Sequence, residues 1–182
     1  MDQKLNICLV KTSLPSYFPE KHDVWEKSIN GLIKICKELN VNLNIIQEIP
    51  MNANDTKKTI SKCKELNTDF ILVLHGGFTM GDVALTFAES NFKLGFWSVP
   101  EPTLTGDVQL NNFVSLNMSM SIAKKVRNTS KNPVSWYYGF ADNKEFKQKI
   151  TLTLQTLQSL KTLSRSRIGL IGGLAMTFYN ME

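Results

Sequence analysis

The sequence has 182 residues, of which 42% are hydrophobic and 20% charged, and its formal net charge is +5. This composition is typical of one globular domain with a buried core. The lysines are scattered and form no basic stripe with interleaved aromatic residues, which argues against nucleic-acid binding. No run approaches the roughly 18 apolar residues of a membrane-spanning helix, and the first residues lack a signal-peptide pattern. We therefore expect a cytoplasmic protein with neither a nucleic-acid nor a membrane partner.

Six short apolar runs recur along the chain, and each is rich in β-branched, aromatic or leucine side chains. They predict strands at residues 5–10, 41–46, 70–74, 94–97, 134–138 and 168–171. Apolar residues at helical spacing lie between these runs. They predict helices at residues 24–39, 56–66, 82–88, 109–126 and 144–163. This alternation predicts an α/β fold with three layers: a doubly wound, mostly parallel sheet of five or six strands, flavodoxin-like or Rossmann-like.

The end of the sequence allows two interpretations. The last predicted strand runs into Gly172 and Gly173, a turn that normally enters a helix in a βαβ fold. Either this strand pairs at an edge of the sheet, or the chain is cut just inside a second domain. We favour the second interpretation, with an amino-terminal α/β domain at residues 1–165 and the first strand of a truncated second domain at residues 166–182.

The cysteines and histidines offer little for metal or disulfide chemistry. Cys8, Cys36 and Cys63 form no CxxC pair and have no histidine nearby in the sequence. We therefore expect reduced residues that pack in the interior. Because His22 and His75 are the only histidines, a multi-histidine metal site within this chain is not expected.

Ligands of open α/β sheets bind outside the carboxyl ends of the strands, so the residues near these ends are the candidates for a site. From these positions we select six candidate substrate-binding residues: Lys11, His75, Phe78, Thr79, Trp97 and Glu101.

For several candidates a purely structural role is the alternative. Gly76 and Gly77 could bring backbone N–H groups close to an anion, or they could form a tight turn with positive φ. His75 is either a base or ligand, or a structural residue held by hydrogen bonds. Trp97 either stacks on a ligand or belongs to the core. Glu101 is a better functional candidate, since the prolines on both sides hold its backbone extended.

The predicted helix at 109–126 carries neutral polar and Met side chains among apolar ones, with few charges. Such a helix suits burial against another protein surface, whereas a solvent-facing helix normally carries Lys and Glu. Burial within the domain itself is the alternative.

Four segments together resemble a known family. They are "VLHGGFTMGD", "GFWSVPEPTLTGDVQLNNFVSLNMSMSIA", "VSWYYGF" and "RIGLIGGLAMTFYNM". From about residue 70 onward the chain resembles the amino-terminal region of the L-fucose isomerase and L-arabinose isomerase family. The resemblance implies a cytoplasmic aldose–ketose isomerase that uses a divalent metal, usually manganese, with the metal ligands in later domains. It also implies that the first domain contributes to the monosaccharide pocket of a neighbouring subunit in a trimer or hexamer.

The resemblance further implies roles for individual residues. It places Phe78 where fucose isomerases carry an aromatic residue, there a Trp, that stacks on the sugar, and Lys11 where the family has a basic or polar substrate contact. We expect stacking by Phe78 or Trp97, hydrogen bonds from His75, Thr79 and Glu101, and a homo-oligomer contact through residues 95–123. The chain stops before any family metal ligand, so we expect it to be inactive alone. A stand-alone module that binds a sugar or phosphate, or serves assembly, is the alternative.

Overall fold

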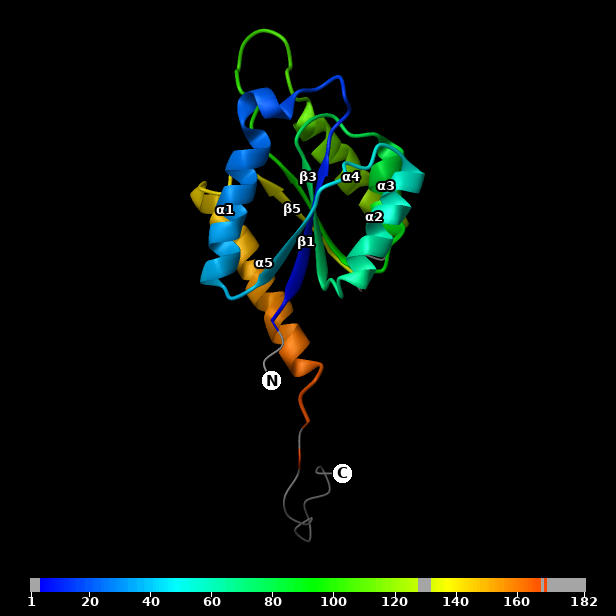
Figure 1. The fold of residues 1–182 in the computed structure, drawn as a ribbon, viewed down its shortest axis with the longest axis vertical. Helices are drawn as coiled ribbons and strands as arrows, with labels where there is room; N and C mark the ends of the chain where they lie inside the picture. Colours follow the sequence, from blue (N-terminus) through cyan, green and yellow to red (C-terminus); the bar gives the residue numbers. More distant parts are fainter. Residues whose placement is uncertain (1–3, 128–131, 168, 170–182) are drawn as a thin grey trace.

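A parallel β-sheet with helices on both faces forms the centre of the molecule (Figure 1). The computed structural model describes residues 4–127, 132–167 and 169. In these residues five strands pair in the order β2-β1-β3-β4-β5, every pair parallel. The strands are β1 (Asn6–Thr12), β2 (Asn42–Ile46), β3 (Phe70–His75), β4 (Lys93–Ser98) and β5 (Val134–Tyr138). This is the doubly wound, flavodoxin-like strand order, which confirms the predicted fold class.

The helices divide into two layers because the chain winds first to one side of β1 and then to the other. On one face lie α1 (Val24–Glu38) and α5 (Lys144–Leu163), and on the other lie α2 (Ala53–Glu65), α3 (Gly81–Glu89) and α4 (Asn112–Val126) (Figure 1). A short 3-10 helix, η1 (Pro19–His22), precedes α1. Each face has its own apolar core, so successive side chains of a strand belong to different cores.

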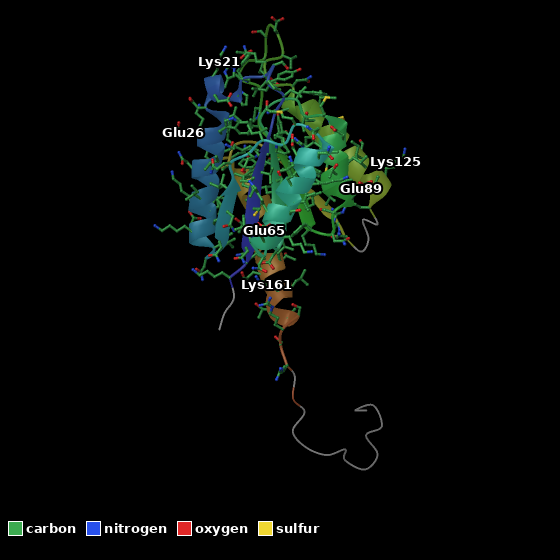
Figure 2. All side chains as sticks on the ribbon, turned by 45° about the vertical axis from the view of Figure 1, so that its right-hand side comes forward. Lys21, Glu26, Glu65, Glu89, Lys125 and Lys161 are labelled. Carbon is green, nitrogen blue, oxygen red and sulfur yellow. The ribbon has the colours of Figure 1, made fainter. Side chains whose placement is uncertain are left out.

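The two ends of the strands differ in what surrounds them. All strands run upward in Figure 1, so the loops after β1, β3 and β4 gather at the upper edge. Figure 2 places Lys21 near this upper edge and Lys161 near the opposite end, on α5. In the described part of the chain, no helix combines the length and the apolar character that crossing a membrane requires.

Most predicted elements are confirmed within a few residues, and the differences have local causes. Helix α2 begins one turn earlier than predicted, because the Asn52 side chain caps it by accepting a hydrogen bond from Asp55 N. The three cysteines are all buried, which confirms their prediction as packing residues. The predicted strand at 168–171 lies outside the described residues apart from residue 169. The same holds for most of the predicted second domain, 166–182, and both stay predictions.

Candidate functional site

Three loops meet where the strands end. We call them the carboxyl rim, and they comprise residues 13–18, 76–80 and 99–111. The first two loops are joined by a hydrogen bond from Leu14 N to Phe78 O at 2.8 Å, and the rings of Tyr17 and Phe78 have centroids 6.2 Å apart. The third loop joins them through the side-chain amide of Asn111, which donates to the Tyr17 hydroxyl at 3.4 Å. The rim therefore presents two half-buried aromatic rings as one unit.

Close packing explains the two glycines in the turn after β3. The prediction that Gly76 and Gly77 adopt a positive φ is wrong. Neither glycine has a positive φ. A Cβ on Gly76 would lie 2.1 Å from the ring of Trp25, and a Cβ on Gly77 would lie 2.4 Å from Ser13 Oγ. The N–H of Gly76 donates to Thr12 O at 2.9 Å, so that group is occupied within the fold. The turn lets the first rim loop and α1 approach the end of β3.

His75 is a neutral, fully buried centre of hydrogen bonds. Its Nδ1 lies 2.8 Å from Thr12 Oγ1 and 3.1 Å from Thr79 Oγ1, while its Nε2 lies 3.1 Å from Ser119 Oγ. Its ring stacks on Phe96 with centroids 5.6 Å apart. Burial lowers the pKa of His75 from 6.5 to about 3, because the protonated ring would lose its hydration. In this arrangement His75 and Thr79 hold the end of β3 in place, and both side chains are buried.

Trp97 and Lys11 lie on the opposite face of the sheet, toward α1 and α5. Trp97 is fully buried, donates from Nε1 to Gly139 O at 2.8 Å, and packs on Phe146 with ring centroids 4.6 Å apart. Lys11 is half-buried, and its Nζ lies 5.8 Å from the centre of the Trp25 ring. The structure therefore brings His75, Phe78 and Thr79 together and leaves Trp97 and Lys11 on the other face.

Glu101 closes the long rim loop. Its carboxylate accepts hydrogen bonds from Leu110 N at 2.9 Å and from Asn111 N at 2.7 Å, directly before α4. Asn111 has a left-handed backbone (φ 53°) and makes no side-chain capping bond. The negative charge therefore lies at the amino-terminal end of the helix, where the helix dipole favours it. Both carboxylate oxygens are engaged within the loop.

A layer of buried polar side chains lies below the rim, and among its members only His75 and Thr79 are site candidates selected from the sequence. We call it the polar layer, and its members, each at most 3% exposed, are Thr12, His75, Thr79, Ser98, Asn112, Ser115 and Ser119. Thr12, His75 and Ser98 are register partners on β1, β3 and β4, so they point to the same face. In the sequence, the sign of this layer is that each of these three apolar strands ends in a polar residue.

Helix α4 contributes the other half of the polar layer. Asn112, Ser115 and Ser119 follow the spacing i, i+3, i+7 and all three are buried, whereas Phe113 and Val114 are 46% and 49% exposed. At the start of α4 the polar side chains are therefore buried and the apolar ones exposed, which is the reverse of an ordinary surface helix. Ser115 Oγ accepts a hydrogen bond from Thr79 N at 2.8 Å, which ties the helix to the rim. Burial of these polar residues takes place within the domain, while the exposed apolar residues face outward.

The side chains described do not form a metal centre. In residues 4–127, 132–167 and 169, no three His, Cys, Asp or Glu side chains lie together so that they could hold a metal ion. His75 already has hydroxyl groups next to both ring nitrogens. The manganese that the family resemblance implies therefore finds no fitting set of donors in the described part of the chain.

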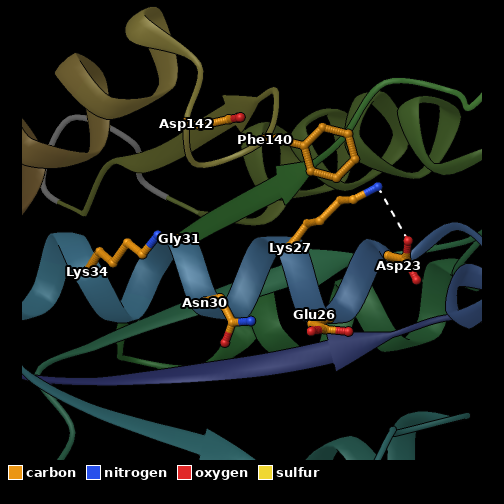
Figure 3. A pocket seen from close by; sticks show the side chains of 8 residues that line it. All are labelled: Asp23, Glu26, Lys27, Asn30, Gly31, Lys34, Phe140 and Asp142. Atoms are coloured by element: carbon orange, nitrogen blue, oxygen red, sulfur yellow. Dashed lines mark ion pairs between the residues drawn. The ribbon is translucent and has the colours of Figure 1, made fainter.

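A separate cavity lies between α1 and the loop after β5 (Figure 3). It has a volume of about 640 Å³ and is lined by Asp23, Glu26, Lys27, Asn30, Gly31, Lys34, Phe140 and Asp142. Lys27 extends toward Phe140, and its Nζ lies 3.5 Å from Asp23 Oδ2. Most of the lining side chains are exposed, and none of the six candidate residues is among them. We assign no function to this cavity.

Comparison with known proteins indicates a distant relation to one class of enzyme. No protein-family model matches the chain. Two sulfoquinovose isomerases, from Priestia aryabhattai and from Priestia megaterium, are each 24% identical to it over 106 residues. The match covers 53% of this chain and 23% of each relative, so the chain corresponds to less than a quarter of their length. This similarity supports a distant relation to a sugar isomerase.

Proposed function

We propose that this chain is an α/β domain of a sugar isomerase that interconverts aldoses and ketoses, and that it contributes contacts to the sugar and between subunits. The observation that carries the proposal is the similarity to the two sulfoquinovose isomerases. The doubly wound fold is compatible with it, because ligands of such sheets bind at the carboxyl ends of the strands. The resemblance of the segments after residue 70 to L-fucose and L-arabinose isomerases supports the same reaction class.

Within the carboxyl rim, we assign sugar stacking to Phe78. Its ring is half-buried beside Tyr17, and its carbonyl is held by Leu14 N, so the ring is presented on a supported loop. An aromatic face packs well against the apolar C–H face of a sugar ring. Lys11 lies near the same end of the sheet but on the face that α1 covers, and we propose that it donates a hydrogen bond to a sugar hydroxyl from that side.

The other candidate residues act as positioning residues in this proposal. His75 and Thr79 lie in the polar layer and fix the loop that carries Phe78. Trp97 supports the end of β4 from within the core, and Glu101 closes the loop that follows it. All four therefore serve the sugar site through the shape of the rim.

Isomerisation itself requires groups that we do not assign to the described residues. The manganese that the resemblance implies has no fitting donor set among residues 4–127, 132–167 and 169, so we propose that the catalytic metal site belongs to another part of the enzyme. We therefore expect the 182-residue chain to bind a monosaccharide without converting it.

The subunit contact is proposed for the region at 95–123. In this region Leu104 is 99% exposed and Val108 63% exposed, in addition to Phe113 and Val114 on α4. Exposed apolar side chains with few charges among them are typical of a surface that another protein covers. We propose a homo-oligomer, a trimer or hexamer, assembled through this surface.

The first test uses the protein as the cell makes it. An antibody raised against this chain captures the native protein, which is assayed with Mn²⁺ for interconversion of sulfoquinovose, L-fucose or L-arabinose and their ketoses. We expect conversion of at least one sugar and a polypeptide larger than 20.6 kDa. A native polypeptide of 20.6 kDa that converts none of them would overturn the isomerase proposal and favour a stand-alone binding or assembly module.

The second test addresses the rim. A saturating sugar should raise the melting temperature of the chain, because the ligand binds only the folded state. Phe78→Ala should abolish this rise. Trp136→Ala, which removes an exposed aromatic ring from the edge strand β5, is the matched control and should keep it. If both variants keep the rise, Phe78 is not the stacking residue.

A further inference from the structure

The polar layer contains two residues whose hydrogen-bonding groups are not satisfied by the described protein. Ser98 Oγ and both Oδ1 and Nδ2 of Asn112 are buried without a hydrogen-bond partner among the described residues. Both residues are 0% exposed. Ser98 is the last residue of β4 and Asn112 is the first residue of α4, so the two flank the rim loop 99–111.

The rest of the polar layer shows that these unsatisfied groups are a local feature. Thr79 Oγ1 donates to Thr12 Oγ1 at 3.0 Å, both threonines lie beside His75 Nδ1, and Ser119 lies beside its Nε2. Buried polar groups in folded proteins are nearly always paired, because an unpaired group loses its hydration without compensation. Three unpaired atoms at the base of one loop therefore indicate a place where another molecule supplies the partners.

The available groups define the chemistry of that molecule. Asn112 offers one amide donor group and one carbonyl acceptor, and Ser98 offers a hydroxyl that can act as either. A sugar hydroxyl also donates and accepts, so vicinal hydroxyls match this set. An anion fits less well, because the polar layer contains no positively charged side chain and His75 is neutral. The backbone N–H groups of Leu110 and Asn111 are not available to an anion either, since they already donate to the carboxylate of Glu101.

We propose that Ser98 and Asn112 bind hydroxyl groups of a neutral monosaccharide or polyol at the base of the loop 99–111. The sugar class rests on the proposed function, and the site deepens it by adding two polar contacts to the stacking contact of Phe78. Because both residues are buried, the ligand enters when the loop moves. Glu101 bonds the loop to the residues directly before α4 and keeps the site closed in its absence.

The side-chain amide of Asn112 gives a direct readout. In a ¹⁵N-labelled chain its NH₂ signals are assigned by their loss in Asn112→Leu, and the chain is titrated with L-fucose, with sorbitol and with inorganic phosphate. We expect the sugar and the polyol to shift these signals and phosphate to leave them unchanged. A shift with phosphate alone, or no shift with any probe, overturns the inference.

Variants separate binding from a structural role. Asn112→Leu and Ser98→Ala remove the unpaired groups, so each should abolish the sugar-induced rise in melting temperature without lowering the melting temperature in buffer. Asn117→Leu changes an exposed amide of α4 and should keep the rise. If both site variants lower the melting temperature in buffer and retain the rise, the two residues are structural and the inference is wrong.

The backbone amide of Phe78 distinguishes this failure from failure of the proposed function. Should L-fucose shift the Phe78 signal while the Asn112 side-chain signals stay in place, the rim binds sugar and only the site at Ser98 and Asn112 is lost. Should neither signal move, sugar binding by this chain is refuted as well, while the assay of the native protein still decides its activity.

Discussion

The carboxylate of Glu101 accepts the backbone N–H of Asn111 at 2.7 Å, ten residues further along the chain. The same carboxylate accepts Leu110 N, so one side chain joins both ends of a loop whose residues 102–109 are all exposed. The loop therefore depends on few contacts of its own, and its closed form depends on this one acid.

Glu101→Ala should loosen the loop and cost about 1–3 kcal/mol at most, because it leaves two backbone donors without their acceptor. Partial exposure to water reduces the loss. Urea denaturation measures the free energy of unfolding, and hydrogen exchange should speed up at Leu110 and Asn111. The matched control is Asp107→Asn, an exposed acid of the same loop, which should change neither. Unchanged exchange at Leu110 and Asn111 in Glu101→Ala would contradict this assignment.

His75 should make the stability of the fold fall with pH in the acidic range. Its pKa is 6.5 when exposed and about 3 in the folded protein, so between these values the unfolded state binds about one more proton. The contribution is complete above pH 6.5 and is lost as the pH falls toward 3. The free energy of unfolding, measured in urea from pH 4 to pH 7.5, should show this slope.

Substitution at each histidine checks the source of that slope. His75→Gln removes the titrating ring, so its curve should be flatter than that of the wild type, whatever its absolute stability. His22→Gln, in the short helix Pro19–His22, should retain the wild-type slope. A slope that persists in His75→Gln would mean that other groups produce it.

Gly76→Ala should destabilise the protein by about 1–3 kcal/mol, because the new methyl group would overlap the Trp25 ring. Gly81→Ala is the control, since the nearest atoms to a Cβ there are 3.6 Å away. Chemical denaturation of both variants measures the difference. In a Trp25→Ala background the cost of Gly76→Ala should shrink, and an equal cost in both backgrounds would refute the packing explanation.

The fold could be predicted from the sequence because burial leaves a local pattern. All six residues of β3 are buried, and they appear in the sequence as an apolar run that ends in His75. The predicted start of α4 was three residues early, since the pattern does not show that Glu101 and the left-handed Asn111 delay the helix. Helix starts depend on such single contacts, which the spacing of apolar residues does not record.

The contacts within the polar layer could not be predicted from local sequence patterns, for a different reason. The sequence predicts that the neutral polar side chains of the helix at 109–126 face another protein or the interior. These side chains include Asn112, Ser115 and Ser119, and the sequence does not indicate their partners. The contact between Ser119 and His75 joins residues 44 positions apart. Only the strand order brings β3 beside β4 and under α4, so the pairing exists only after the fold has formed. Because polar residues of α4 occupy the buried face at the start of the helix, the apolar residues Phe113 and Val114 are left exposed.

Phe113 and Val114 should be the residues on which assembly depends. Phe113 packs against Tyr138 at 5.1 Å between ring centroids, yet both α4 residues remain about half exposed. Replacing the pair with lysine places two charges where an apolar contact is proposed, so the oligomer should dissociate while the fold persists. Sedimentation equilibrium measures the mass, and circular dichroism checks the fold.

Leu152→Lys provides the control for this change, because Leu152 is an exposed apolar residue on α5, outside the region 95–123. It should leave the mass of the oligomer unchanged. If the wild-type chain is a monomer at all concentrations, residues 95–123 do not assemble copies of this chain by themselves. A wild-type oligomer that both variants leave intact would instead place the contact on another face of the domain.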